Sequence, residues 1–416
     1  MKKWDIQKKE KVDKSELEYD INAPIRTLSA GEIVRQAREQ EELYRFADNS
    51  FPDDVDGRGK EIILKVRHLS LGFLSHGKKT HVIRDVSIDV FKGETLAIVG
   101  ESGSGKSVFT KTFTGMLDSN GFIDGGSIEF GGKDLAKLKT EKDWLGIRGK
   151  RISTIFQDPM TSLNPLLTIG FQITEVLRLH RGMDRKTAKA EAIELLKRVR
   201  IPEAEKRFND FPYQYSGGMR QRVVIAIALA CNPEILICDE PTTALDVTVQ
   251  AQIIKLIKDL QREYKWTVIF ITHDLGVVAN IADRVAVMYG GQIIEYGTSE
   301  DVFYNPAHPY TWALLSSLPQ LGSKEDPLVF IRGNPPSFIE EIIGDSFAPR
   351  NEYSLKIDFI LDPPMFKITD THFAKTWLLD KRAPNVEPPK IIQNLRQRMK
   401  ESADELKREL KVGEAV

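Results

Sequence analysis

One glycine-rich segment combines the residue types that hold phosphate groups. It reads GESGSGKS, satisfies the pattern G-x-x-x-x-G-K-[ST], and lies between an apolar run and a helical pattern. Glycines let backbone N–H groups approach phosphates, the lysine of this pattern reaches the β- and γ-phosphates, and its hydroxyl suits Mg²⁺. The segment therefore predicts a nucleotide site made by Gly100, Ser102, Gly103, Ser104, Gly105, Lys106, Ser107 and Val108.

Two adjacent carboxylates end a second apolar run, Ile235–Cys238. Such a strand exposes only its end, so Asp239 is placed to meet magnesium, often through water, and Glu240 is the candidate general base. An isolated acidic pair after a strand would more often cap a loop or a helix. The phosphate loop upstream and the following run Pro241–Asp246 favour the catalytic interpretation, and Asp246 joins the candidate nucleotide-binding residues.

Two single polar residues follow further apolar runs. Gln157 comes after Ile152–Phe156, and His273 comes after Val268–Thr272. Taken alone, a glutamine or histidine at such a place is usually structural. Beside a phosphate loop and an acidic pair, both become candidates for the same site.

A small tripeptide, Ser216-Gly217-Gly218, opens a predicted helix over Met219–Ala230. Serine is a good N-cap, and glycine allows a phosphate to come close. Without the other motifs this would be plain helix capping. Its place between Gln157 and the acidic pair distinguishes it from such a cap.

The elements that must position these residues alternate between strands and helices. The run Thr95–Val99 leads into the phosphate loop, and a helical pattern follows over Lys106–Leu117. Alternation of this kind predicts an α/β core with a largely parallel sheet. Further predicted elements are strands over Ile62–Val66, His81–Val90 and Thr267–Thr272, helices from Ile169 to Val199, and a hairpin in which Arg284–Met288 and Gln292–Tyr296 flank Gly290-Gly291.

Composition narrows the function classes. The 416 residues include 59 Lys+Arg and 60 Asp+Glu, without the basic excess expected of a nucleic-acid-binding protein. The cysteines, Cys231 and Cys238, lie in apolar runs and predict buried reduced thiols. No secretory signal is visible, and the longest apolar run, Val223–Cys231, is far shorter than the roughly 20 residues of a membrane helix.

The order of these motifs resembles the ATP-binding-cassette (ABC) ATPases. Longer strings narrow the resemblance, over about Leu64 to Pro336, to the ATPase subunits of oligopeptide and dipeptide permeases. The resemblance implies an α/β fold with an ABC-type nucleotide-binding domain and a small C-terminal domain. The nucleotide-binding domain would consist of a P-loop core, a β-subdomain and a helical subdomain. These strings are IFQDPMTSLNP (155–165), QYSGGMRQRVVIAIALACNPEILICDEPTTALDVTVQAQI (214–253), ADRVAVMYGGQIIEYG (282–297) and NPAHPYTWALLSSLP (305–319).

The resemblance also implies roles for single residues. In such ATPases the residue at Gln157 touches the metal and water, and the residue at His273 contacts the γ-phosphate. The segment Ser216–Gly218 caps the nucleotide held by a partner subunit. Phe73 is a weaker candidate for stacking on adenine, because a strand core residue is an equal alternative.

A member of this family would bind ATP and Mg²⁺ and power peptide uptake from the cytoplasmic side of the cell membrane, as a peripheral protein. Its expected partners are a second ABC ATPase subunit (a paralogue), two membrane permeases and, indirectly, an extracytoplasmic peptide-binding protein, with no nucleic acid. The alternatives are a related importer of nickel or oligosaccharide and, from another class, a soluble non-transport ABC ATPase. A degenerate cassette is disfavoured, because Lys106, Asp239, Glu240 and His273 are all present.

The predicted domains are a polar N-terminal extension over 1–60, an ABC ATPase domain over 61–319, a C-terminal domain over 320–380 and a charged helical tail over 381–416. The helical subdomain is expected at about 158–230. A possible helix in the extension begins near Ser29, and the tail repeats apolar residues from Ile392 to Leu410.

Permease ATPases of this type commonly carry four cysteines for an iron–sulfur cluster in the C-terminal domain. The corresponding positions hold Asp345, Asn351 and, approximately, Asp358 and Thr376. Such clusters need thiolate ligands. No iron–sulfur cluster is therefore expected.

Overall fold

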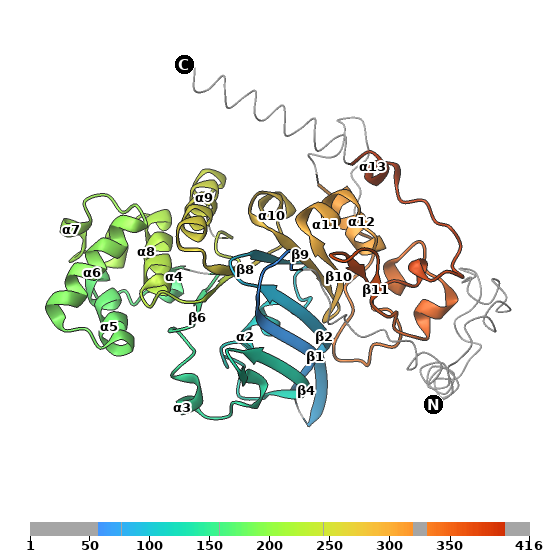
Figure 1. Ribbon diagram of the computed structural model, residues 1–416, viewed down its shortest axis with the longest axis horizontal. Helices are drawn as coiled ribbons and strands as arrows, with labels where there is room; N and C mark the ends of the chain where they lie inside the picture. Colours follow the sequence, from blue (N-terminus) through green and yellow to red (C-terminus); the bar gives the residue numbers. More distant parts are fainter. Residues whose placement is uncertain (1–56, 76, 158, 244, 319–330, 396–416) are drawn as a thin grey trace, which may run out of the picture. The chain divides into compact units, whose positions relative to one another are not determined.

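The computed structural model describes residues 57–75, 77–157, 159–243, 245–318 and 331–395 (Figure 1). The described residues fall into two compact units, an N-terminal unit over 57–286 and a C-terminal unit from 287 onward. This division falls at residue 286, whereas the sequence predicted a domain end at 319. The domain limits from the sequence stay predictions, and the possible helix near Ser29 lies outside the described residues.

A parallel sheet forms the centre of the N-terminal unit. Its strands lie in the order β3 (Thr95–Val99), β8 (Thr267–Thr272), β7 (Ile235–Asp239) and β6 (Ile152–Ile155). All residues of β3 and β8 are buried, as continuous apolar runs in a parallel sheet should be. Val99 lies opposite Thr272, and Asp239 opposite Ile271, so the carboxyl ends of the strands meet at one edge. The predicted α/β core is confirmed.

An antiparallel sheet also belongs to this unit. Its order is β2 (Lys78–Phe91), β1 (Ile62–Ser75), β4 (Gly121–Phe130) and β5 (Lys133–Asp134). The sequence did not predict β4, because its middle residues are turn formers. Gly126 has a φ of +91°, and a β-carbon there would lie 2.5 Å from the carbonyl oxygen of His68. The strand pairing shifts register beside this point.

Helices α5 (Ile169–Arg181), α6 (Arg185–Arg198) and α8 (Gly217–Leu229) share one hydrophobic core cluster. Figure 1 shows α5, α6 and α7 (Ala204–Arg207) grouped beside α8. Thr168 and Asp184 cap α5 and α6 by accepting backbone N–H groups. The remaining helices here are α3 (Glu141–Trp144), α4 (Pro159–Ser162), α9 (Val247–Tyr264) and α10 (Leu275–Ile281).

The helix after the phosphate loop, α2 (Lys106–Lys111), is shorter than predicted. The chain turns at Gly115, whose φ is +61°. A β-carbon at this glycine would lie 2.2 Å from the Trp144 ring. After Lys111 the backbone bonds shorten to the i→i−3 type, and Met116 N donates to the carbonyl oxygen of Lys111 around Gly115. The expectation of a helix to Leu117 is therefore wrong.

The C-terminal unit is built around β10 (Gln292–Thr298), β12 (Phe373–Ala374) and β11 (Phe366–Lys367), which lie side by side. Strand β9 (Arg284–Tyr289) crosses the division of the chain, and its hairpin with β10 at Gly290-Gly291 is confirmed. Glu295 of β10 is fully buried and accepts bonds from Ala307 N, His308 N and His372 Nε2. The helices are α11 (Ser299–Tyr304), α12 (Pro309–Ser316) and α13 (Lys390–Gln393).

The cysteines and the tail agree only in part with the sequence predictions. Cys238 is buried in β7, but Cys231 is only half-buried and follows α8, so the prediction of two buried thiols holds for Cys238 alone. Of the tail, Ile392 and Leu395 are described and buried, whereas the stripe beyond them lies outside the described residues. None of the described helices is both long and apolar enough to cross a membrane.

Candidate functional site

The phosphate loop connects β3 to α2 and has the backbone of an anion cradle. Gly103 and Gly105 have φ values of +81° and +102°, which glycine adopts without strain. The buried ammonium of Lys106 donates to the carbonyl oxygens of Gly100 at 2.8 Å and Glu101 at 2.9 Å. Burial lowers the pKa of Lys106, and the charges of Glu240 and Asp239 oppose that shift. The loop therefore holds the ammonium group of Lys106 against its own backbone, close to where a phosphate would bind.

Two oxygen ligands of the predicted metal site meet at the sheet edge. The Ser107 hydroxyl donates to Oδ1 of Asp239 at 2.8 Å. Burial raises the pKa of Asp239, the Ser107 bond opposes this, and Glu240 adds to it. A hydroxyl and a carboxylate are ligands that Mg²⁺ prefers, and Mg²⁺ usually takes few protein ligands beside phosphate and water. No group of three or more His, Cys, Asp or Glu side chains in the described residues is arranged to hold a metal.

A second observation fits a nucleotide. The Ser104 hydroxyl within the loop is buried and has no hydrogen-bond partner among the described residues. A buried hydroxyl without a partner is costly unless an acceptor reaches it. The residues present therefore fit a phosphate group with a magnesium ion.

The carboxylate of Glu240 lies at the centre of a group of polar side chains, the Glu240 cluster. The backbone of Glu240 is left-handed, with a φ of +46°, and its N–H donates to the carbonyl oxygen of Ile271 at 3.0 Å. Gln157 Nε2 donates to one carboxylate oxygen at 3.2 Å, and His273 Nδ1 lies 3.3 Å from the other. These contacts hold the carboxylate among polar groups at the edge of the sheet, where a general base would be needed.

The sequence analysis missed one member of this cluster. The Thr243 hydroxyl donates to the same oxygen of Glu240 as Gln157 does, at 3.0 Å. Thr243 lies three residues after Glu240 in the run Pro241–Asp246. A turn directly after the candidate base was therefore the signal that could have found it.

The tripeptide Ser216-Gly217-Gly218 lies at the start of α8. The exposed Ser216 caps the helix by accepting the Met219 N–H at 3.3 Å. A β-carbon on Gly218 would lie 2.6 Å from Cγ1 of Val249 in α9, so glycine allows the two helices to approach. The preceding Tyr215 is buried, donates to the carbonyl oxygen of Arg207 at 2.8 Å, and has its pKa raised to about 12 by burial.

Asp246 lies beside this segment and not at the phosphate loop. Its carboxylate caps α9 by accepting the Val249 N–H at 2.9 Å. None of the described contacts of Asp246 or of Ser216–Gly218 involves Lys106. Within this chain the predicted residues thus form two groups, one around the loop and Glu240 and one at the starts of α8 and α9.

Phe73 belongs to neither group. It lies half-buried in β1, opposite Gly121 of β4, and its ring edge is close to that glycine. Its carbonyl oxygen accepts the Thr80 hydroxyl at 3.1 Å. Adenine stacking by Phe73 stays a prediction.

The four positions discussed for a cluster are all buried in the C-terminal unit. Each side chain accepts an N–H from its own stretch of backbone: Asp345 from Phe347, Asn351 from Tyr353, Asp358 from Leu355 and Thr376 from Leu378. Burial, and then the charge of Asp345, hold the pKa of Asp358 well above its usual range. These oxygen side chains cap turns, and they do not fit an iron–sulfur cluster.

Two protein families match the chain. The family described as ABC transporter matches residues 83–243, and the family described as oligopeptide/dipeptide transporter, C-terminal region, matches residues 294–357. An ATP-binding cassette solved as a dimer in a post-hydrolysis state with ADP and Pi is similar in structure. Its TM-score is 0.51 at 29% identity, covering 57% of this chain and 98% of that one. The ABC fold predicted from the sequence is confirmed.

Curated relatives extend the likeness to nearly their full length. The oligopeptide transport ATP-binding protein AmiE of Streptococcus pneumoniae is 59% identical, over 82% of this chain and 96% of the relative. The oligopeptide transport ATP-binding protein OppD of Bacillus subtilis is 56% identical, over 80% and 93%. The dipeptide transport ATP-binding protein DppD of Lactococcus lactis is also 56% identical, over 79% and 94%. This chain therefore belongs to the ATP-binding proteins of ABC oligopeptide and dipeptide transporters.

Proposed function

We propose that this chain binds ATP with Mg²⁺ and hydrolyses it to drive the uptake of oligopeptides or dipeptides through membrane permeases. The observation that carries the proposal is the meeting, at one sheet edge, of Lys106, the Ser107–Asp239 pair and the Glu240 cluster. Family membership supplies the peptide substrate class.

The residues divide the chemistry among them. Lys106 and the loop N–H groups bind the phosphates, and Ser107 and Asp239 would hold Mg²⁺, whose charge stabilises the phosphates. Glu240 orients the attacking water and takes its proton. Gln157, Thr243 and His273 position the Glu240 carboxylate through the contacts described above.

The partner cassette would complete each site. The N-terminus of α8 is formed by Ser216–Gly218, and none of the described contacts joins this segment to the phosphate loop of the same chain. Glycine at a helix N-terminus lets the backbone N–H groups bind a phosphate. A head-to-tail pair, with a paralogous cassette as the second member, would place this segment on the other subunit's γ-phosphate. The dimeric cassette among the similar structures supports the pairing of two cassettes.

Transport itself would take place in other chains. The expected position is peripheral, at the cytoplasmic face of the cell membrane, beside two permeases, with an extracytoplasmic peptide-binding protein delivering the substrate. Closure of the two cassettes on ATP and reopening after hydrolysis would drive the permeases.

Uptake in proteoliposomes tests the function. The assembled transporter should take up a labelled oligopeptide with ATP, and Lys106→Ala in this chain should abolish uptake by removing a direct phosphate contact. Lys139→Ala, at an exposed lysine outside the site, is the matched control. ATP-driven uptake of nickel or an oligosaccharide but of no peptide would overturn the substrate assignment.

A second variant tests the paired arrangement. Ser216→Arg should stop turnover by filling the space that a partner's phosphate needs, at the further cost of about 1 kcal/mol for the lost cap. This chain's own ATP binding should remain. Nucleotide binding is measured separately at each site of a mixed pair. Loss at the Lys106 site, with the partner site intact, would contradict the head-to-tail arrangement.

A further inference from the structure

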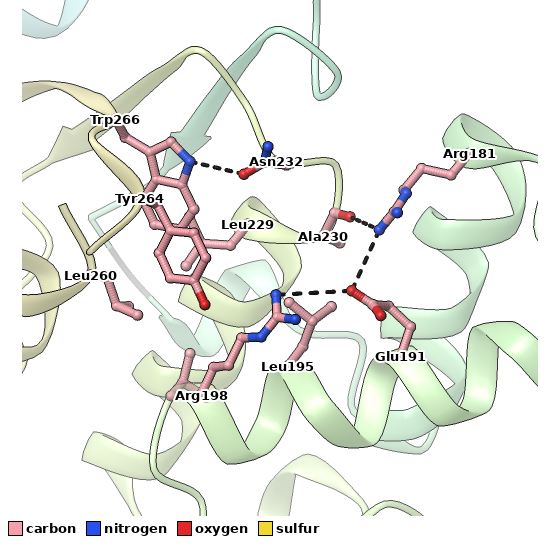
Figure 2. Close-up of a pocket in the computed structure, with 11 residues that line it drawn as sticks. Arg181, Glu191, Leu195, Arg198, Leu229, Ala230, Asn232, Leu260, Tyr264 and Trp266 are labelled. Atoms are coloured by element: carbon pink, nitrogen blue, oxygen red, sulfur yellow. Dashed lines mark hydrogen bonds and ion pairs between the residues drawn. The ribbon is translucent and has the colours of Figure 1, made fainter. Parts of the chain in front are cut away.

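A pocket of about 290 Å³ lies in the N-terminal unit and is lined by residues of α5, α6, α8 and α9 and of the turns that follow α8 and α9 (Figure 2). One side is aromatic. Tyr264 and Trp266 stack with ring centroids 4.7 Å apart, because the left-handed Lys265 between them, with a φ of +54°, turns both rings to the same side. Trp266 Nε1 donates to Asn232 Oδ1 at 3.0 Å, which fixes the indole.

The other side of the pocket is charged. Figure 2 shows Glu191 between the guanidinium groups of Arg181 and Arg198. Oε1 of Glu191 lies 3.5 Å from Arg181 and 3.9 Å from Arg198. Both ion pairs are made by Nη1 atoms, and Nη1 of Arg181 also donates to the carbonyl oxygen of Ala230 at 3.3 Å. A guanidinium has five N–H donors and a carboxylate has two oxygens, so the remaining N–H groups and Oε2 of Glu191 can meet a ligand.

Apolar side chains join the two sides. The buried side chains of Leu195, Leu229 and Leu260 also line the pocket. The Arg198 guanidinium also lies 5.8 Å from the Tyr264 ring centroid, at cation–π distance, so one arginine links the charged side to the aromatic side.

We propose that this pocket binds a small zwitterion with an apolar side chain, namely an amino acid or a short peptide. Two arginines suit a carboxylate, which guanidinium binds in a bidentate fork, and Glu191 suits an ammonium group. The stacked rings and the leucines suit an aromatic or aliphatic side chain. Ligand pockets usually measure roughly 300–1,000 Å³, so a cavity of this size takes a ligand at the small end.

None of the lining residues belongs to the nucleotide site, so the pocket stands independently of the proposed function. Only the choice of a peptide as one probe rests on that function. The ATPase activity of the assembled transporter, measured on the same preparations, separates failure of this proposal from failure of the proposed function.

Isothermal titration calorimetry on the full-length protein tests the proposal with L-phenylalanine and the dipeptide Ala-Phe as separate probes. Saturable binding of either probe is expected. Arg198→Gln and Arg181→Gln should each weaken it by about 10- to 100-fold, the effect of losing a hydrogen bond to a charged group. Arg185→Gln, at an exposed arginine at the start of α6 outside the pocket, should leave it unchanged.

Modified probes test each charge. The Ala-Phe amide lacks the carboxylate, N-acetyl-Ala-Phe lacks the ammonium group, and each should bind at least about tenfold more weakly. Thermal melting of every variant checks the fold. Absence of binding up to millimolar concentrations, equal binding by the wild type and both pocket variants, or equal binding of the acetylated dipeptide would overturn the proposal.

Discussion

Asp239 of the N-terminal unit is half-buried and Asp358 of the C-terminal unit is buried, and the pKa of each carboxyl group is raised mainly by loss of solvent. Their neighbours differ. Asp239 accepts the Ser107 hydroxyl and lies in the field of Lys106 and Lys111, whereas Asp358 faces the like charge of Asp345. The same shift therefore has opposite meanings. Against burial and the charge of Glu240, Asp239 has one hydroxyl and two lysines that favour its charged form, whereas the neighbouring charge at Asp358 adds to burial and favours its neutral form.

A carboxyl group with a raised pKa identifies a reactive site only when the side chains around it could also act on a ligand. Around Glu240 and Asp239, hydroxyl, amide, imidazole and ammonium groups converge from separate strands and loops. The carboxylates of Asp345 and Asp358 accept backbone N–H groups within three residues of each acid. The first arrangement suits chemistry on a ligand, and the second suits a folded turn.

The largest effect should come from Glu240→Gln. Removal of a general base typically lowers the rate 10²- to 10⁴-fold, or about 3–5 kcal/mol in the barrier, while the loop that binds the phosphates is untouched. ATPase turnover of the assembled transporter and ATP binding are measured together. Glu129→Gln, at an exposed position of β4, is the control. Turnover close to wild type would remove Glu240 from its role.

Asp345→Asn should change the pH dependence of stability and leave ATP hydrolysis intact. A carboxyl with a raised folded pKa stabilises the fold below its unfolded pKa of about 4, and this stability is lost as pH rises through the folded value. Removing the charge at 345 brings the pKa of Asp358 down. The variant should therefore gain stability relative to wild type as pH rises, by at most about 1.4 kcal/mol per pH unit.

Urea unfolding between pH 4 and pH 8, followed by tryptophan fluorescence, measures this difference, since Trp377 packs in the same core cluster as Leu355 and Ile357. Asparagine keeps an oxygen for the Phe347 N–H. Asp370→Asn, at an exposed residue paired with Lys367, is the matched control. Parallel pH profiles for wild type and Asp345→Asn would show that the two carboxyl groups are not coupled.

The smallest effect should come from Asp246→Ala. Loss of its cap on α9 should cost about 1 kcal/mol of stability, without changing ATP binding at the Lys106 site. Thermal unfolding and nucleotide titration of the single chain measure both quantities. Strong loss of ATP binding would place Asp246 with its own chain's nucleotide and merge the two groups of residues that the structure separates.

The sequence predicted buried parallel strands best. The limits of β3 and β8 agree with the apolar runs, because strands covered on both faces need apolar residues at every position. It failed where distant residues decide the local structure. The Trp144 ring lies so close to Gly115, just beyond α2, that no β-carbon fits there, and β4 tolerates turn-forming residues because a bulge in β1 accommodates them.

The candidate site shows the same limit. The ends of β3, β7 and β8 could be placed together from the parallel order alone, since carboxyl ends share one edge. The contact of Thr243 with Glu240 depends on the turn after β7, and the self-capping of Asp345 and Asp358 depends on turns that no apolar period marks. The pocket at Tyr264 and Trp266 depends on helices distant in sequence.

The left-handed backbone at Glu240 has a consequence for how this chain can evolve. That conformation costs a residue with a β-carbon roughly 1–2 kcal/mol and costs glycine almost nothing. Variants selected only for stability should therefore carry glycine or asparagine at position 240, and each such change removes the carboxylate proposed as the general base. Stability of the fold and the proposed hydrolysis of ATP therefore favour different residues at position 240, and the glutamate found there is the residue that hydrolysis favours.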